Sequence, residues 1–283
     1  RMTLLKKNFP YDHWELLGAD RGDRLRIVPE RGGLITEWRC KGKEILYFDF
    51  ERFKQKDKSI RGGIPVLFPI CGNLPGDLLQ LEKGNFKLRQ HGFARDIAWK
   101  IKSMNDPSCF LLSFLDNKET RAAFPYSFLV EMEVRLERNA INFKIIIRNF
   151  STEKMPFSFG LHPYFNVMDL VQTTIEGLPL TCTNQLKMIE AKTAEQISAI
   201  SEGIDFISGP SKLVTLVDQC AGTRLHLQHQ EPMDLTVVWS DPPRKMVCLE
   251  PWTSPRFSLV NGERKLLLNP GAFQELKCRF IID

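Results

Sequence analysis

The sequence predicts an all-β protein, a sandwich or barrel of antiparallel strands with few short helices. Apolar and polar residues alternate at period two in many short stretches, turn residues separate ten or more such stretches, and helical periodicity is rare. A length of 283 residues suits one large β domain as well as two smaller ones. The candidate linker at 205–212 is too short to require a boundary, so we expect a single domain over residues 1–283.

The two clearest strands form a hairpin near the middle of the chain. Apolar residues hold alternate positions over 130–136 and again over 141–147, and the turn Arg138-Asn139-Ala140 joins the two runs. Short helices are expected at 50–57 and 192–199, neither with an apolar stripe of helical period. Further strands are expected near 24–29, 33–40, 44–48, 97–103, 109–115, 155–160, 224–229, 234–239, 245–249 and 274–282.

The charge balance and the absent motifs narrow the choice of partner. Lys plus Arg number 39 against 34 Asp plus Glu, a mild excess that favours small anions at least as much as nucleic acid. The densest basic run, over 52–61, lacks interleaved aromatic residues and is typical of a solvated loop. The sequence contains neither a nucleotide-binding glycine motif nor a run of about 18 apolar residues. We therefore expect a small-molecule partner, no nucleic acid, no membrane, and a monomer or weak dimer.

The cysteines indicate a reducing compartment. Seven are scattered along the chain without a CxxC pair, which argues against disulfides and a zinc knuckle. Cys248, for example, lies among apolar neighbours, as buried free thiols usually do. We expect a cytoplasmic protein.

Three of the five histidines do not indicate a functional site. His226 and His229 belong to one alternating run, where a spacing of three puts them on opposite faces of a sheet, so they are not expected to share a metal ion. His13 has no partner pattern and is most simply a structural or surface histidine.

The other two histidines have more suggestive neighbours. His91 lies in a polar cluster with Gln90, and the following Gly92 lets the backbone bend or come close to a ligand. His162 precedes Pro163, which favours an extended backbone over a helix. Taken alone, each histidine is as readily explained by a structural role.

Further candidates carry charge at sites where the chain bends or a strand ends. Glu250 follows the apolar run 245–249; it is either a strand-end residue that reaches solvent or a partly desolvated general base. The nearby ring of Trp252 suits the apolar face of a sugar. Asp205 is most simply a turn residue. Arg61 precedes two glycines that allow an anion to approach, although a plain turn explains the pattern equally well.

Four blocks in order carry a resemblance to a known family. They are Arg61-Gly62-Gly63-Ile64-Pro65 with Phe68-Pro69, Gln90-His91-Gly92-Phe93-Ala94-Arg95 with Trp99, Leu161-His162-Pro163-Tyr164-Phe165, and Leu249-Glu250-Pro251-Trp252. Together they resemble the hexose-6-phosphate 1-epimerases, the YeaD-like branch of the galactose mutarotase superfamily, over about residues 25–282. The resemblance implies a β-sandwich of the supersandwich type with a shallow cleft, and interconversion of aldose anomers with neither a metal nor an organic cofactor.

The resemblance also implies roles for the candidate residues. By position, His162 looks like the general acid and Glu250 like the general base. His91 matches a histidine that supports the ring oxygen, and Asp205 matches an aspartate that binds sugar hydroxyls. Arg61 and Arg95 match arginines that bind the phosphate. With Gln90 and Trp252, the substrate-binding set expected is His91, Asp205, Arg61, Arg95, Gln90 and Trp252.

The chemistry of ring opening agrees with these roles. A base must take the anomeric hydroxyl proton while an acid protonates the ring oxygen, and Glu and His have reference pKa values of about 4.3 and 6.5. We therefore expect an aldose 1-epimerase, with a hexose 6-phosphate as the first substrate class and a neutral hexose as the next. The alternative is a non-catalytic carbohydrate-binding or regulatory protein of the same fold. A glycoside hydrolase ranks third, because it needs two carboxylates and only Glu250 is a strong candidate.

Overall fold

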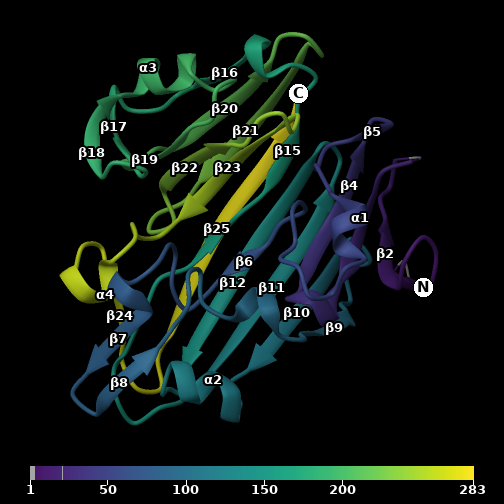
Figure 1. Cartoon of the computed structure of the whole chain (residues 1–283). Helices are drawn as coiled ribbons and strands as arrows, with labels where there is room; N and C mark the ends of the chain where they lie inside the picture. The colour runs from purple at the N-terminus through teal and green to yellow at the C-terminus, as the bar shows by residue number, and fades with distance from the viewer. Residues whose placement is uncertain (1–3, 21) are drawn as a thin grey trace.

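Two antiparallel sheets of eight strands each form the framework of this computed structural model, which describes residues 4–20 and 22–283 (Figure 1). We call the first the β12 sheet. Its strands, in spatial order, are β16 (Thr173–Glu176), β20 (Leu213–Asp218), β21 (Thr223–His229), β25 (Phe273–Ile282), β12 (Ala140–Asn149), β11 (Phe128–Glu137), β10 (Cys109–Leu115) and β9 (Lys100–Ser103).

The second sheet, called the β23 sheet, carries the candidate site described below. Strand β15 (Tyr164–Asn166) pairs with β23 outside the main order of the sheet. The strands in that order are β18 (Ile189–Lys192), β17 (Thr181–Asn184), β19 (Asp205–Ser208), β22 (Leu235–Ser240), β23 (Met246–Trp252), β14 (Gly160–Leu161) and β6 (Val66–Leu67).

Smaller elements complete the described part of the chain. A five-stranded sheet consists of β1 (Leu4–Lys7), β2 (His13–Leu17), β3 (Arg24–Val28), β4 (Leu34–Cys40) and β5 (Lys43–Glu44). Two-stranded ribbons pair β7 (Leu78–Leu81) with β8 (Gly84–Lys87) and β13 (Met155–Phe157) with β24 (Leu266–Leu268). The helices are α1 (Phe50–Phe53), α2 (Lys118–Ala123), α3 (Thr193–Ser198) and α4 (Ser258–Asn261), and the 3-10 turns are η1 (Pro29–Arg31), η2 (Pro75–Asp77), η3 (Ala94–Asp96) and η4 (Leu170–Gln172).

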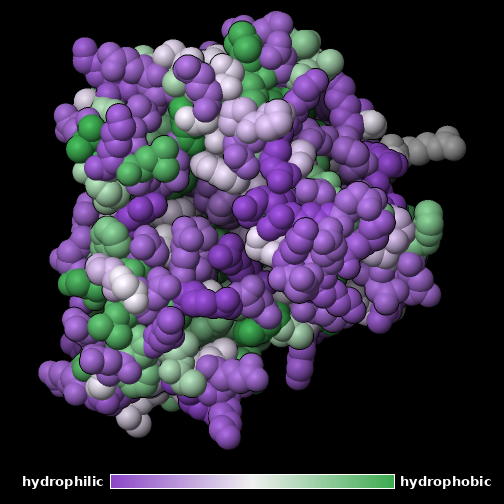
Figure 2. All heavy atoms as spheres, viewed as in Figure 1, coloured by the Kyte–Doolittle hydropathy of each residue, from purple (hydrophilic) through white to green (hydrophobic). Residues whose placement is uncertain are grey.

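The alternating pattern of the sequence explains the core. Along β11 every second side chain is buried, and the register pairs Val130 with Ile147 and Met132 with Ile145 of β12. Buried residues of both large sheets and of the five-stranded sheet join in one apolar cluster. The fold is therefore the antiparallel β-sandwich with few short helices that the sequence predicts. Hydrophilic residues cover most of the face in Figure 2, with apolar residues in small scattered groups.

Segments far apart in the sequence meet inside the β12 sheet. Figure 1 shows the yellow β25, from the C-terminal end, between the teal β12 and the green β21, and both pairings are antiparallel. In β21 His229 shares the buried face with Leu225 and Leu227, whereas His226 lies on the other face. The prediction that these two histidines lie on opposite faces of a sheet is thus confirmed.

Most expected strands are present, and four expectations have wrong boundaries, one of them the strand expected at 245–249, which runs on to Trp252. The strand expected at 97–103 begins only at Lys100, because the preceding turn η3 is tied down by the indole of Trp99, which donates to the carbonyl of Ala94 at 2.8 Å. The strand expected at 44–48 is reduced to β5 and two isolated bridges. The strand expected at 155–160 splits into β13 and the start of β14, which belong to different sheets.

The helices are shorter than expected or absent from the expectation. The helix expected at 50–57 ends at Phe53, and α3 confirms the one expected at 192–199. Helix α2 was not expected, although its start carries a sequence signal. Asn117 and Thr120 exchange side-chain and backbone hydrogen bonds in a capping box. No helix of the described residues has the length and apolar character needed to cross a membrane.

Candidate active site

All eight residues expected at the site line one cavity of about 400 Å³. The cavity opens on the face of the β23 sheet that is turned away from the main core. Loops before β6, after β8 and after β23 close its sides. Besides the expected residues, the lining contains Ser59, Tyr164, Gln185, Val237, Trp239 and Arg256.

The register of the β23 sheet explains how distant residues reach one face. Side chains alternate along β23, so that Val247 and Leu249 enter the main core while Glu250 and Trp252 take the opposite face. On the neighbouring strand, Val237 pairs with Glu250. Directly paired residues on neighbouring strands point to the same face of a sheet. The Glu250 carboxylate therefore lies on the face that also carries residues of β22 and β19.

Glu250 is not at the end of a strand, which corrects one expectation. Strand β23 runs on to Trp252, and the Glu250 side chain is 1% exposed rather than reaching solvent. The strand continues past Pro251 because Trp252 still pairs with Gly160 of β14. The desolvated alternative considered for this carboxylate is the one observed.

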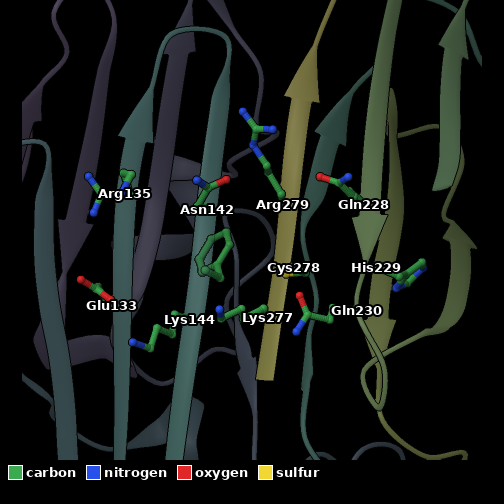
Figure 3. A pocket seen from close by; sticks show the side chains of 11 residues that line it. Glu133, Arg135, Asn142, Lys144, Gln228, His229, Gln230, Lys277, Cys278 and Arg279 are labelled. Carbon is green, nitrogen blue, oxygen red and sulfur yellow. The ribbon is translucent and has the colours of Figure 1, made fainter. Parts of the chain in front are cut away.

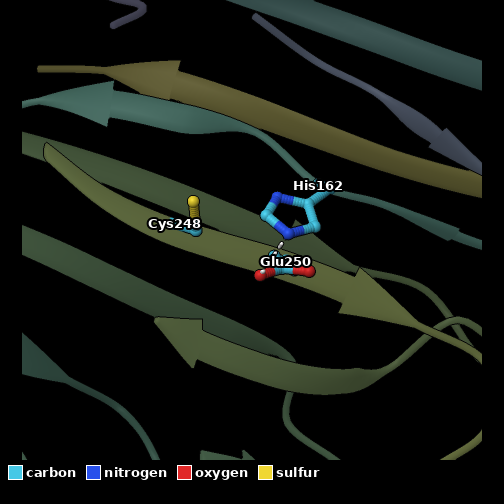
Figure 4. Close-up of side chains that lie close together, drawn as sticks. All are labelled: His162, Cys248 and Glu250. Carbon is cyan, nitrogen blue, oxygen red and sulfur yellow. Dashed lines mark ion pairs between the residues drawn. The ribbon is translucent and has the colours of Figure 1, made fainter. Parts of the chain in front are cut away.

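The catalytic candidates lie against each other at the base of the cavity. Nε2 of His162 is 3.5 Å from Oε2 of Glu250, as Figure 4 shows. The other carboxylate oxygen, Oε1, accepts a hydrogen bond of 3.0 Å from Nε1 of Trp252. The imidazole stacks on the ring of Tyr164, with 4.9 Å between the centroids. The indole and the phenol ring therefore orient the carboxylate and the imidazole.

Backbone contacts place His162 at this point. Its N–H donates to the carbonyl of Pro65 at 2.9 Å, and the N–H of Tyr164 donates to the carbonyl of Gly63 at 3.0 Å. The Arg61 block and the His162 block of the sequence thus form adjacent strands. Nδ1 of His162 is buried and has no hydrogen-bond partner in the described part of the chain, so no acceptor there competes for the ring proton.

Burial shifts the pKa values of His162 and Glu250 in the directions that favour the neutral form of each group. Desolvation raises the pKa of Glu250 well above its usual range, and the charge of Asp205 adds to the rise. Desolvation lowers the pKa of His162 to about 3, with a further contribution from the charge of Arg95. Neither group is favoured as an isolated charge, so the two titrate as a coupled pair that holds one mobile proton over a wide pH range.

His91 is fixed as a neutral hydrogen-bond donor. Its Nδ1 accepts a hydrogen bond of 2.9 Å from the N–H of Gly72, so in the neutral ring the proton is on Nε2. Burial lowers the pKa of His91 well below its usual range. The residue adopts a left-handed backbone with φ 64°, and Gly92 follows with φ 72°. The tight turn is held to the core because Phe93 and Ala94 both donate to the carbonyl of Phe68.

Three guanidinium groups line the cavity without a carboxylate partner among residues 4–20 and 22–283. Arg61 contacts only the hydroxyl of Ser59, at 3.5 Å, and Arg95 donates to the carbonyl of Gln90 at 3.3 Å. Arg256, which the sequence did not indicate, donates to the carbonyl of Gln185 at 3.3 Å. Such groups suit a bound anion, because their charge is not yet neutralised.

Asp205 is not a turn residue, which corrects the simplest interpretation of its sequence. It is the first residue of strand β19. Its Oδ1 accepts a hydrogen bond of 2.8 Å from Nε2 of Gln185, and burial raises its pKa. Gln185 had no sequence signal, since it follows β17 in an otherwise ordinary polar stretch. Tyr164 did have one, its position in the same block as His162.

A larger hollow on the β12 sheet lacks a buried acid–base pair like His162 and Glu250 among the residues that line it. It measures about 620 Å³ and opens on the face turned away from the core (Figure 3). Its charged residues form ion pairs along the sheet, such as Lys277 with Glu275 at 3.1 Å and Arg279 with Glu137 at 3.6 Å. His229 at its edge is held by Thr236 and the carbonyl of Met233. This surface has the features of a solvated sheet face rather than of a catalytic site.

Comparisons with known proteins agree with the fold and show the family. Residues 19–280 match the family model described as aldose 1-epimerase. A Cenchrus ciliaris protein provisionally named a glucose-6-phosphate 1-epimerase is 29% identical over an alignment of 272 residues, and the match covers 85% of this chain and 76% of that protein. An Escherichia coli protein with the same provisional name is 25% identical over 171 residues, 59% of this chain and 53% of that protein.

Solved structures extend the likeness to three dimensions. A crystal structure of a Synechocystis protein has a TM-score of 0.90 at 30% identity and covers 100% of this chain and 96% of its own. A galactose mutarotase-like protein from Clostridium acetobutylicum has a TM-score of 0.82 at 19% identity, covering 99% of this chain and 97% of its own. The second likeness shows a shared fold.

Proposed function

The chain belongs to the aldose 1-epimerase family, and from that premise we propose that it interconverts the α and β anomers of a hexose 6-phosphate such as glucose 6-phosphate. One observation carries the proposal. A buried acid–base pair, His162 and Glu250, lies at the base of a cavity whose rim holds guanidinium groups without carboxylate partners among the described residues. The pair supports the anomer exchange, and the rim supports the phosphate.

The coupled pair suits reversible ring opening. In the form of the pair that has the shared proton on His162, the imidazolium donates this proton from Nε2 to the ring oxygen and becomes neutral. The carboxylate of Glu250 meanwhile accepts the proton of the anomeric hydroxyl, and the C1–O5 bond breaks to give the open aldehyde. Rotation about C1–C2 exposes the other carbonyl face. Ring closure then reverses both transfers: the carboxyl returns a proton to the C1 oxygen, and the imidazole takes the proton of the C5 hydroxyl. Each group of this kind commonly supplies about 10²- to 10⁴-fold.

The remaining cavity residues suit the sugar itself. The Nε2–H that the backbone leaves on His91 donates to the ring oxygen or a neighbouring hydroxyl. Asp205 accepts a hydroxyl, since only one of its oxygens is bonded to Gln185. Gln90 and the ring of Trp252 complete the contacts expected from the sequence. These assignments do not require a metal ion.

The phosphate is assigned to Arg61 and Arg95. Both line the cavity, and each contacts only a neutral oxygen among the described groups. A dianion between them would make charge-assisted hydrogen bonds, which are shorter and stronger than neutral ones. The provisional names of the relatives from Cenchrus ciliaris and Escherichia coli also favour a 6-phosphate over a free hexose.

The test is anomer-exchange NMR with glucose, galactose and their 6-phosphates in parallel. We expect the protein to accelerate exchange most for a 6-phosphate, and Glu250→Gln or His162→Asn to remove the acceleration while circular dichroism stays unchanged. His226→Asn, on the other large sheet, is the matched control and should retain the wild-type rate. Saturable sugar binding without any acceleration would instead indicate the non-catalytic carbohydrate-binding protein.

The setting of the protein is also proposed rather than observed. All seven cysteines are free, six of them buried, which supports a reducing compartment such as the cytoplasm. The single domain over 1–283 and the monomeric or weakly dimeric state stay predictions.

A further inference from the structure

We propose that Zn²⁺ binds between His162, Cys248 and Glu250 and thereby blocks the site. The metal acts here as an inhibitor and has no part in the reaction. The binding half of the proposal needs only the geometry of the three residues, whereas the inhibitory half rests on the proposed epimerase function.

The three donor atoms are already grouped. A ring nitrogen of His162, Sγ of Cys248 and a carboxylate oxygen of Glu250 all lie within 4.8 Å of one another, and Figure 4 shows the three side chains gathered at one point. Two ligands of a tetrahedral Zn²⁺ with bonds of about 2.1 Å stand about 3.4 Å apart. The imidazole and the carboxylate, at 3.5 Å, therefore need almost no movement, and only the thiol must approach.

The elements that carry the donors are rigid. Cys248 and Glu250 are two residues apart on β23 and take the same face, so their spacing is set by the strand. His162 directly follows β14, which pairs with β23. The indole of Trp252 occupies Oε1 of Glu250, which leaves Oε2 as the oxygen that faces the imidazole. This outer contact orients the ligand, as is usual around metal ions.

The donor types select a borderline or soft cation. Imidazole, thiolate and carboxylate are the ligands that Zn²⁺ takes in proteins, whereas Mg²⁺ and Ca²⁺ require oxygen. A second sulfur, Sδ of Met246, lies 4.0 Å from Sγ of Cys248. Three protein ligands leave a fourth position toward the cavity for water.

Charge balance explains how a cation is accepted beside arginines. Binding removes the thiol proton of Cys248 to solvent, so that the thiolate and the carboxylate of Glu250 bring two negative charges against the two positive charges of Zn²⁺. The filled site is then neutral, and Arg61 and Arg95 face no added positive charge. The proton shared by His162 and Glu250 is displaced at the same time, so the acid–base pair no longer transfers protons.

The ion reaches the site through the sugar cavity. The His162 side chain is 12% exposed and lines that cavity, whereas Cys248 is buried behind it among Tyr164, Trp239 and Met246. A bound sugar therefore covers the entrance. We expect sugar and metal to exclude each other.

The binding half is tested with Co²⁺, which replaces Zn²⁺ and reports thiolate ligation by a charge-transfer absorption band. Wild-type protein should develop the band with one equivalent of Co²⁺ and lose it when Zn²⁺ is added. Cys248→Ala should abolish the band, while Cys278→Ala, another buried thiol, and Cys220→Ala, the exposed one, should keep it. Glu250→Gln, which keeps the side-chain shape, should weaken Co²⁺ binding at least about tenfold.

The inhibitory half is tested by anomer-exchange NMR. Zn²⁺ should slow the wild-type rate, Mg²⁺ should not, and Cys248→Ala should require at least about tenfold more Zn²⁺ for the same inhibition. The absence of a band in wild-type protein, or a band unchanged in both Cys248→Ala and Glu250→Gln, overturns the proposal. A band in a protein without epimerase activity supports the metal site and refutes the proposed function, so the two failures are distinct.

Discussion

Replacing Arg61 with alanine tests the phosphate assignment with little risk to the fold. The side chain lines the cavity, and within residues 4–20 and 22–283 its only hydrogen bond is the 3.5 Å contact with the hydroxyl of Ser59. Arg61→Ala therefore leaves no buried charge without its partner. Gly62 and Gly63, which carry the turn, are unchanged. We expect the melting temperature of the variant to stay close to that of the wild type.

The expected loss follows from one charge-assisted contact. A hydrogen bond to a charged group contributes about 1.5–3 kcal/mol, which corresponds to about 10- to 150-fold in kcat/KM for glucose 6-phosphate. Arg61 is only half-buried, so solvent and salt weaken its field and the lower end of this range is expected. Free glucose has no phosphate for Arg61 to contact, and its kcat/KM should change by less than about twofold.

The assay is anomer-exchange NMR with both sugars at low and high salt. Arg89→Ala serves as the matched control, because Arg89 is exposed, pairs with Asp96 at 3.1 Å and does not line the cavity. It should leave both rates unchanged. Equal losses for glucose and glucose 6-phosphate in Arg61→Ala would refute the phosphate role of this residue.

Three further predictions concern Glu250, the indole that bonds to it, and the turn that holds His91. Trp252→Phe removes the donor that lowers the pKa of Glu250, so the acid limb of the kcat/KM profile should move to higher pH; a pH-rate series checks this, and an unmoved limb contradicts it. Glu250→Gln should raise the melting temperature at pH 7 but much less at pH 4, because burial raises the pKa of this carboxyl and wild-type stability is lost as pH rises above the ordinary carboxyl range. Calorimetry at the two pH values decides, and an equal difference at both would oppose the assignment. Gly92→Ala should lower the free energy of unfolding by roughly 2–4 kcal/mol in urea titrations, because at φ 72° its Cβ would lie 2.2 Å from the carbonyl oxygen of Phe68; a change below about 0.5 kcal/mol would show that the turn relaxes freely.

Period-two alternation alone determined most strands and which of their faces is buried. The hairpin of β11 and β12 follows its pattern residue by residue. A shift by one residue would turn all of its apolar side chains from the core to solvent. Where tertiary contacts override the pattern, the expected boundaries are wrong. At Trp99, for example, the indole bonds to the turn η3, and the strand begins only at the next residue.

The four motifs likewise predicted a set of residues that lie together in the folded chain. His91, His162 and Glu250 each belong to a block that has a recognisable order, and all three line one cavity. Gln185 and Arg256 had no such signal, because their relevance comes only from the loops that bring them to the same rim.

Only the tertiary structure decided the state of these residues. A single sequence cannot reveal that β23 pairs with β22 on one edge and with β14 and β15 on the other, because strand order depends on contacts between segments far apart in the chain. That pairing buries Glu250 beneath His162 and brings Cys248 to the same point. The sequence by itself thus predicted which residues meet at the cavity, and the packing of the sheet determined which protonation states are favoured and which groups surround them, because burial and distance exist only in the folded chain.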